Sequence, residues 1–223
     1  MPEHRLGVLA LHVLATIDHI ARVIREADYI PTTKRGSGAA EMTAQEAVNL
    51  LLAANGADTP SDGPAAIDRF RSLRLETYRP ADTAVATFKA ITEAENFGRA
   101  LEILIDGMPE VLRIAFDFVE RCYPQKAEVL KGTLLKHTWD LAPFNVSVQL
   151  KRYSTEIVCR SWAEMSGAAQ TEFAAQFQVD YDLLTEGFYG RLPGRKISVE
   201  FGGETLLKLS TALRTDSAAK EVL

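Results

Sequence analysis

Residues 14–54 read LATIDHIARVIREADYIPTTKRGSGAAEMTAQEAVNLLLAA. The stretch holds two segments with helical spacing, and a short segment rich in glycine and basic residues separates them. Two short helices with a glycine-rich hairpin between them are typical of a winged helix-turn-helix head. This stretch therefore decides the expected fold of the N-terminal part of the chain.

The first helix is predicted to begin at Thr16, a natural N-cap residue, and to end before Pro31. Ile17, Ile20 and Ile24 recur at three- and four-residue spacing, which predicts one buried stripe. Pro31 ends the helix because proline moves the preceding residue out of the α region. The opposite face carries the polar residues Asp18, His19, Arg22, Arg25 and Glu26.

The segment after this helix, TTKRGSGAA at 32–40, places two glycines next to Lys34 and Arg35. Glycine adopts the unusual backbone angles of a tight hairpin, so we expect an exposed wing here. Thr43 and Glu46 form the T-x-x-E pattern of a capping box and predict the start of the second helix. Its end is predicted at Asn55-Gly56.

The remainder of the chain predicts a second, mixed domain. Residues 57–64 (ADTPSDGP) are proline- and glycine-rich and are typical of a linker. Helical spacing then predicts helices over 65–78, 96–106 and 110–122, the last two separated by Gly107 and Pro109. Alternating apolar residues predict strands over 144–153, 155–162 and 195–201, followed by a helix over 204–213. Residues 173–181 fit no single period.

We therefore expect an α+β protein with three parts. Residues 1–56 form a winged helix-turn-helix head, and residues 57–64 form a linker. Residues 65–223 form a C-terminal domain of helices and a small antiparallel sheet, which mediates oligomerisation or binds a partner.

Contacts with double-stranded DNA are expected from the helix that begins at Thr16, because a recognition helix enters the major groove. Its candidate contact residues are Thr16, Asp18, His19, Arg22 and Arg25. The wing adds Lys34, Arg35 and Gly36, since cations bind phosphates and glycine lets the backbone approach closely. Residues 1–64 nevertheless hold five Lys and Arg against eight Asp and Glu. We therefore expect a homo-oligomer that presents several heads at once.

The same stretch resembles the N-terminal head of phage and prophage-type regulatory proteins of α-proteobacteria. Those heads have a helix end of the form R-x-L-R-E-A-G-x-[LI], a turn GRGxxAxxMT and a helix A-x-NLLLA. Asp28 stands where that pattern has glycine. The resemblance covers about a fifth of the chain and implies a DNA-binding protein of a phage or mobile element. The matching residues are Arg22, Arg25, Glu26, Ala27, Ile30, Arg35, Gly36, Gly38, Ala39, Met42, Thr43, Asn49 and Leu50.

Motifs of catalysis and metal binding are not found in the sequence. Gly202-Gly203 precedes a predicted helix, but the phosphate-binding patterns GxGxxG and GxxxxGK[ST] are absent. The four histidines have no metal-ligand spacing, and Cys122 and Cys159 have no CxxC context, so we expect reduced thiols. We expect no enzyme, no catalytic residue, no metal and no cofactor.

The function predicted from the sequence is a sequence-specific DNA-binding transcriptional regulator of phage or mobile-element origin. One alternative is a small terminase subunit that recognises packaging DNA, and another is a protein-interaction module that binds no DNA. The net charge of −5 excludes a generally basic protein but allows a local basic face. No apolar run approaches a membrane span and the N-terminus lacks a signal-peptide pattern, so we expect a cytoplasmic protein without membrane contact.

Overall fold

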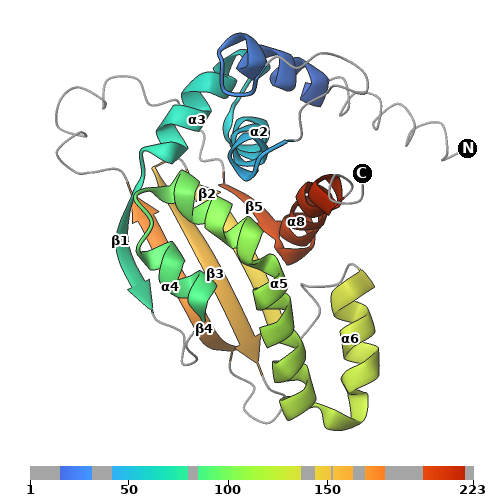
Figure 1. Cartoon of the computed structure of the whole chain (residues 1–223). Coiled ribbons are helices and arrows are strands. Elements are labelled where there is room, and N and C mark those ends of the chain that lie inside the picture. Colours follow the sequence, from blue (N-terminus) through green and yellow to red (C-terminus); the bar gives the residue numbers. More distant parts are fainter. Residues whose placement is uncertain are drawn as a thin grey trace, which may run out of the picture.

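The computed structural model describes residues 16–31, 42–79, 85–136, 144–151, 153–162, 169–178 and 198–218. Within these residues the fold is α+β, with helices packed against an antiparallel sheet of five strands (Figure 1). The α+β class predicted from the sequence is thus confirmed. The predicted wing (32–40) and the apolar N-terminal residues before Thr16 lie outside the described residues.

The sheet has an edge strand that comes from early in the chain. The strands are β1 (Arg74–Arg79), β2 (Phe144–Lys151), β3 (Ser154–Trp162), β4 (Ala169–Gln178) and β5 (Ser198–Gly202). They lie in the order β1-β4-β3-β2-β5, and each neighbouring pair is antiparallel. Strands β2, β3 and β4 follow one another as a meander, whereas β1 pairs with the outer side of β4.

Alternation of side chains gives the sheet one apolar face and one mostly polar face, on which Val158 of β3 is a buried apolar exception. In β2, Phe144, Val146, Val148 and Leu150 are buried, and Val146 pairs with the buried Cys159 of β3. The apolar side chains form one side of the hydrophobic core. The residues between them point to the opposite side, which we call the polar face.

Helices cover the apolar face (Figure 1). Phe88 stacks on Phe173 of β4 with ring centroids 4.6 Å apart, and Phe97 meets Phe177 edge-on at 5.4 Å. The buried Leu206 joins the last helix to the same core. The helices are α4 (Ala86–Thr92) and α5 (Phe97–Cys122) over the sheet, with α8 (Gly203–Ala218) packed beside α5.

A second group of helices lies at one end of α5 (Figure 1). Ile24, Leu52 and Ile67 are fully buried among these helices, and they belong to the same core cluster as the sheet residues. We call this group the head helices: helix 16–26, α2 (Ala44–Gly56) and α3 (Gly63–Arg71), with the 3-10 turn η1 (Pro60–Asp62) between the last two. After α5, the turn η2 (Pro124–Lys126) leads into α6 (Ala127–Lys136).

The predicted capping box of the second head helix is confirmed. The hydroxyl of Thr43 accepts a hydrogen bond from the Glu46 amide at 3.2 Å, and the Thr43 amide donates to the Glu46 carboxylate at 2.8 Å. These bonds satisfy amide groups at the first turn that have no partner within the helix. Within the described residues, the predicted strands over 144–153, 155–162 and 195–201 are confirmed as β2, β3 and β5, and the helix predicted after Gly202 is confirmed as well.

The prediction of one helix over 65–78 is wrong at its C-terminal end. Helix α3 stops at Arg71, and residues 74–79 form the edge strand β1 instead. Leu75 is the one half-buried residue of this strand and the others are exposed, so the strand has no alternating apolar pattern. Pairing with β4, which is distant in sequence, decides its conformation.

The prediction of two helices over 96–106 and 110–122 is also wrong, because α5 continues through Gly107 and Pro109. A Cβ atom on Gly107 would lie 2.3 Å from the hydroxyl oxygen of Thr87 on α4. Gly107 therefore makes room for α4 rather than ending a helix. Pro109 lies exposed on the outer side of α5.

The predicted linker 57–64 contains the turn η1 and the first residues of α3. Gly63 is buried, and a Cβ there would lie 3.0 Å from Ile24. Residues 169–178, which partly cover the segment without a clear period, form strand β4.

Candidate functional site

The outer side of helix 16–26 presents the predicted DNA-contact residues. Thr16, Asp18, His19 and Arg22 are exposed and Arg25 is half-buried. At about 100° per residue, Asp18, His19, Arg22 and Arg25 fall within an arc of about 120° on one side of the helix. We call Thr16 and these four residues the outer face of helix 16–26. Lys34, Arg35 and Gly36 lie outside the described residues.

The inner side of the same helix is fixed to the core. Ile20 and Ile24 are buried at 5% and 0% exposure, which orients the outer face away from the other head helices. The helix ends in a Schellman motif, in which the Tyr29 amide donates to the Ile24 carbonyl at 2.9 Å and the Asp28 amide donates to Arg25. Asp28 has φ of 62°, the left-handed conformation that glycine adopts most easily.

Tyr29 holds this helix end against α3. Its hydroxyl donates a 2.5 Å hydrogen bond to a carboxylate oxygen of Asp68. This bond, together with burial and the Asp68 charge, raises the pKa of Tyr29 to about 12. The Tyr29 carbonyl accepts a 2.9 Å hydrogen bond from the side chain of Asn49 on α2. The outer face of helix 16–26 is thus presented by a supported helix end.

Arg71 extends this support to α5. Its guanidinium donates to Asn49 at 2.6 Å and to Glu102 at 2.8 Å, and it also reaches the Gln45 carbonyl at 3.3 Å. The Glu102 side chain is only 8% exposed, and its other oxygen accepts from Arg99 at 3.0 Å. A buried carboxylate needs such partners because burial removes its hydration. The network joins the head helices to the helix that covers the sheet.

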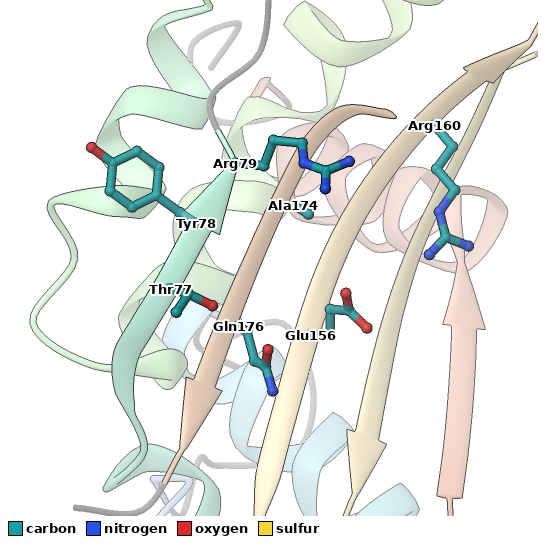
Figure 2. Close-up of a pocket in the computed structure, with 7 residues that line it drawn as sticks. All are labelled: Thr77, Tyr78, Arg79, Glu156, Arg160, Ala174 and Gln176. Carbon is teal, nitrogen blue, oxygen red and sulfur yellow. The ribbon is translucent and has the colours of Figure 1, made fainter. Parts of the chain in front are cut away.

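A second candidate site is a shallow depression of about 340 Å³ on the polar face, at the end where β1 lies beside β4. Figure 2 shows its polar side chains on one side of the sheet, with Tyr78 pointing outward from β1. We call it the sheet depression, and it is lined by Thr77, Tyr78, Arg79, Glu156, Arg160, Ala174 and Gln176.

Arginines without a partner are concentrated in these two places. Most arginines of the described residues form an ion pair, a hydrogen bond or a contact with an aromatic ring, as Arg71, Arg113 and Arg121 do. The described arginines that have none of these contacts are Arg22, Arg25, Arg79 and Arg160. Two lie on the outer face of helix 16–26, and two line the sheet depression.

The sheet depression is not among the sites predicted from the sequence. Alternation along β3 could have placed Glu156 and Arg160 on the polar face, since they are four residues apart on one strand. Nothing local in the sequence places Arg79 near them, because the spacing around β1 predicts a helix. Its position depends on pairing with β4, which in turn lies beside β3.

The described ranges contain no group of three or more His, Cys, Asp or Glu residues arranged to hold a metal ion. No helix in the described part of the chain is long and apolar enough to cross a membrane. Comparisons of the chain with protein-family models, with curated proteins and with solved structures gave no match.

Proposed function

We propose that the chain is a DNA-binding regulatory protein whose winged helix-turn-helix head reads DNA through helix 16–26. The observation that carries the proposal is the outer face of this helix, where Arg22 and Arg25 have no partner among the described residues. An arginine without an acidic partner is available to bind phosphate or a base edge. The likeness of residues 14–54 to phage regulatory proteins supports the same function.

The support of helix 16–26 fits this role. Helix α2 is the weaker candidate for the recognition helix, because Ala47, Val48, Asn49, Leu52 and Ala53 are buried and Asn49 already binds Arg71 and Tyr29. Helix 16–26 is the head helix with a wide polar side. In this proposal Lys34, Arg35 and Gly36 of the wing contact the adjacent backbone, and the protein acts in the cytoplasm as a homo-oligomer.

Fluorescence anisotropy with short labelled duplexes of randomised sequence tests DNA binding. Affinity is measured as salt rises from about 50 to about 200 mM, because release of counterions gives a steep salt dependence. Replacing Arg22 or Arg25 with Ala is expected to weaken binding and to reduce the salt slope by about one for each phosphate that the variant no longer binds. A variant in which Arg22, Arg25, Lys34 and Arg35 are all replaced with Ala is expected to lose DNA binding.

Arg113→Ala is the matched control, since Arg113 lies exposed on α5 and forms a surface ion pair with Asp117. It should bind DNA as the wild type does. Equal binding by wild type and the Arg22→Ala/Arg25→Ala variant would remove helix 16–26 as the DNA-binding face. Selection of a bound sequence from the random duplexes would establish sequence specificity. Light scattering separates the alternatives, with a ring expected for a small terminase subunit and a smaller oligomer for a regulator.

A protein-interaction function is the second candidate, and the charge of helix 16–26 favours it. Asp18, Glu26 and Asp28 outnumber the two arginines on this short segment, and all three acids are exposed. Mixed charges suit a protein partner, whereas phosphates are repelled by carboxylates. In that case no salt-dependent DNA binding is observed, and Arg22→Ala weakens capture of the partner instead.

A further inference from the structure

The sheet depression is built from neighbouring rows of side chains on the polar face. Arg79 of β1 pairs with Ala174 of β4, and Thr77 pairs with Gln176. The next strand places Glu156 opposite Gln176. The small side chain of Ala174 leaves space beside Arg79, so the depression lies between taller polar residues.

The two arginines face this space from separate strands. Arg79 lies on β1 and Arg160 on β3, with β4 between them. Arg79 lies opposite Ala174, which lies opposite Val158, and Arg160 follows Val158 by two residues. Two spacings between strands and a two-residue step along β3 therefore separate the Cα atoms of the two arginines by about 12 Å. Arginine side chains are long enough to reach a common small ligand over such a separation. Their guanidinium groups bind carboxylates through paired hydrogen bonds.

Glu156 adds an opposite charge to the same depression (Figure 2). Its carboxylate lies 4.0 Å from Lys151, and the Glu156 side chain is 28% exposed. Neither Arg79 nor Arg160 lies within ion-pair distance of Glu156 or of any other acid in the described part of the chain. The lining therefore offers two unpaired cations and one partly exposed carboxylate, which has a single long ion pair with Lys151 among the described residues.

We propose that the sheet depression binds an acidic amino acid, glutamate or aspartate, as a small-molecule ligand. Its two carboxylates bind Arg79 and Arg160, and its ammonium group binds Glu156. Thr77 and Gln176 supply further hydrogen bonds. A volume of about 340 Å³ lies at the lower end of the range of small-molecule sites. Glu156 disfavours nucleic acid or another polyanion here, because its charge repels phosphates.

Isothermal titration calorimetry of the full chain with L-glutamate and L-aspartate tests the proposal. Glutarate lacks the ammonium group, glutamine lacks the second carboxylate, and inorganic phosphate tests for a general anion site. Wild-type protein is expected to bind glutamate or aspartate saturably and about tenfold or more tightly than these three compounds, because each comparator lacks a charged group that the site binds.

Substitutions assign the contacts. Arg79→Gln and Arg160→Gln are each expected to weaken binding of the acidic amino acid about tenfold or more. Glu156→Gln should weaken it and remove the preference over glutarate, since that preference comes from the ammonium group. Arg113→Gln, at an exposed position of α5, should bind as the wild type does. Thermal unfolding without ligand checks that each variant is folded.

Three results would overturn the proposal: no saturable binding of glutamate or aspartate, equal binding of phosphate or glutarate by the wild type, and unchanged binding after Arg79→Gln or Arg160→Gln. DNA binding is tested separately, because the Arg22→Ala/Arg25→Ala variant keeps the whole depression. That variant should still bind the amino acid. A failure of the DNA-binding proposal can therefore be distinguished from a failure of the amino-acid proposal.

Discussion

The guanidinium of Arg71 on α3 lies 2.8 Å from the carboxylate of Glu102 on α5, and both side chains are largely withdrawn from solvent. Asn49 and Arg99 bind the same pair, so the ions are joined to three helices. The ion pair connects the head helices to the body of the protein.

Replacing Glu102 with Gln should lower the free energy of unfolding by about 3 kcal/mol, because Arg71 then stays enclosed without its counter-charge. Urea unfolding at neutral pH measures the change. Glu93→Gln removes the exposed Lys89–Glu93 pair and should change the free energy by no more than about 0.5 kcal/mol. Equal decreases in the two variants would show that the buried pair contributes no more than a surface pair.

Replacing Gly98 with Ala should be destabilising by about 1–2 kcal/mol, although alanine normally favours helix over glycine. A Cβ at this position would lie 2.7 Å from Cγ and Nη1 of Arg71. In an Arg71→Ala background the clash is gone, and the same substitution should stabilise by up to about 1 kcal/mol. A double-mutant cycle by urea unfolding measures this change of sign, and a destabilisation that persists without Arg71 would contradict the explanation.

Asp28→Gly should stabilise the protein by about 0.5–1 kcal/mol, because Asp28 has φ of 62° and glycine adopts this conformation without strain. Thermal unfolding measures the gain. Ala57, at the end of α2, has φ of −91°, so Ala57→Gly relieves no strain and should be neutral or destabilising. A decrease of stability in Asp28→Gly would mean that the Asp28 side chain itself contributes to the turn.

Glu110→Gln should lower the free energy of unfolding by about 1–2 kcal/mol at pH 7, since Glu110 accepts hydrogen bonds from the hydroxyl and amide of Thr87 at the start of α4. The Thr87 hydroxyl is the main cause that lowers the pKa of Glu110. The ionised Glu110 carboxylate therefore stabilises the folded state fully above the pKa that Glu110 has in the unfolded chain. This stabilisation is lost as the pH falls through the lower pKa that Glu110 has in the folded state. The difference between wild type and variant should shrink below about pH 4.

Urea unfolding at several pH values provides this measurement. Asp117→Asn serves as the control, because Asp117 lies on the same helix and its ion pair with Arg113 is exposed to solvent. It should change the free energy by about 0.5 kcal/mol or less at pH 7. A Glu110→Gln difference that stays constant from pH 7 to strongly acidic pH would show that the ionised carboxylate is not the stabilising group.

Elements whose conformation is decided locally could be predicted from the sequence. Thr43 and Glu46 cap α2 through hydrogen bonds between residues three apart, and the alternation in β2 reports its half-buried position directly. In contrast, β1 is a strand only because β4 pairs with it, and Leu75 alone points inward. From the sequence alone, Gly107 is typical of a helix end. Its close packing against Thr87 of another helix cannot be predicted from the residues around it.

The candidate sites divide in the same way. Arg22 and Arg25 could be placed on one helix side from spacing alone, and the structure leaves Arg22 exposed and Arg25 half-buried there. The sheet depression depends on the order of the strands. This order places Arg79 of β1 beside Ala174 of β4, and it places Arg160 on β3, the next strand of the sheet. No pattern within either strand encodes that order.

The close approaches of two glycines on α5 also define how distant relatives of this chain can be recognised. Gly98 faces Arg71 and Gly107 faces Thr87, each with no room for a further carbon atom. A larger residue at either glycine should therefore be tolerated better when its partner becomes smaller. Among homologous sequences we therefore expect position 71 to vary together with position 98, and position 87 together with position 107. Such paired changes can identify relatives whose overall sequence similarity is low.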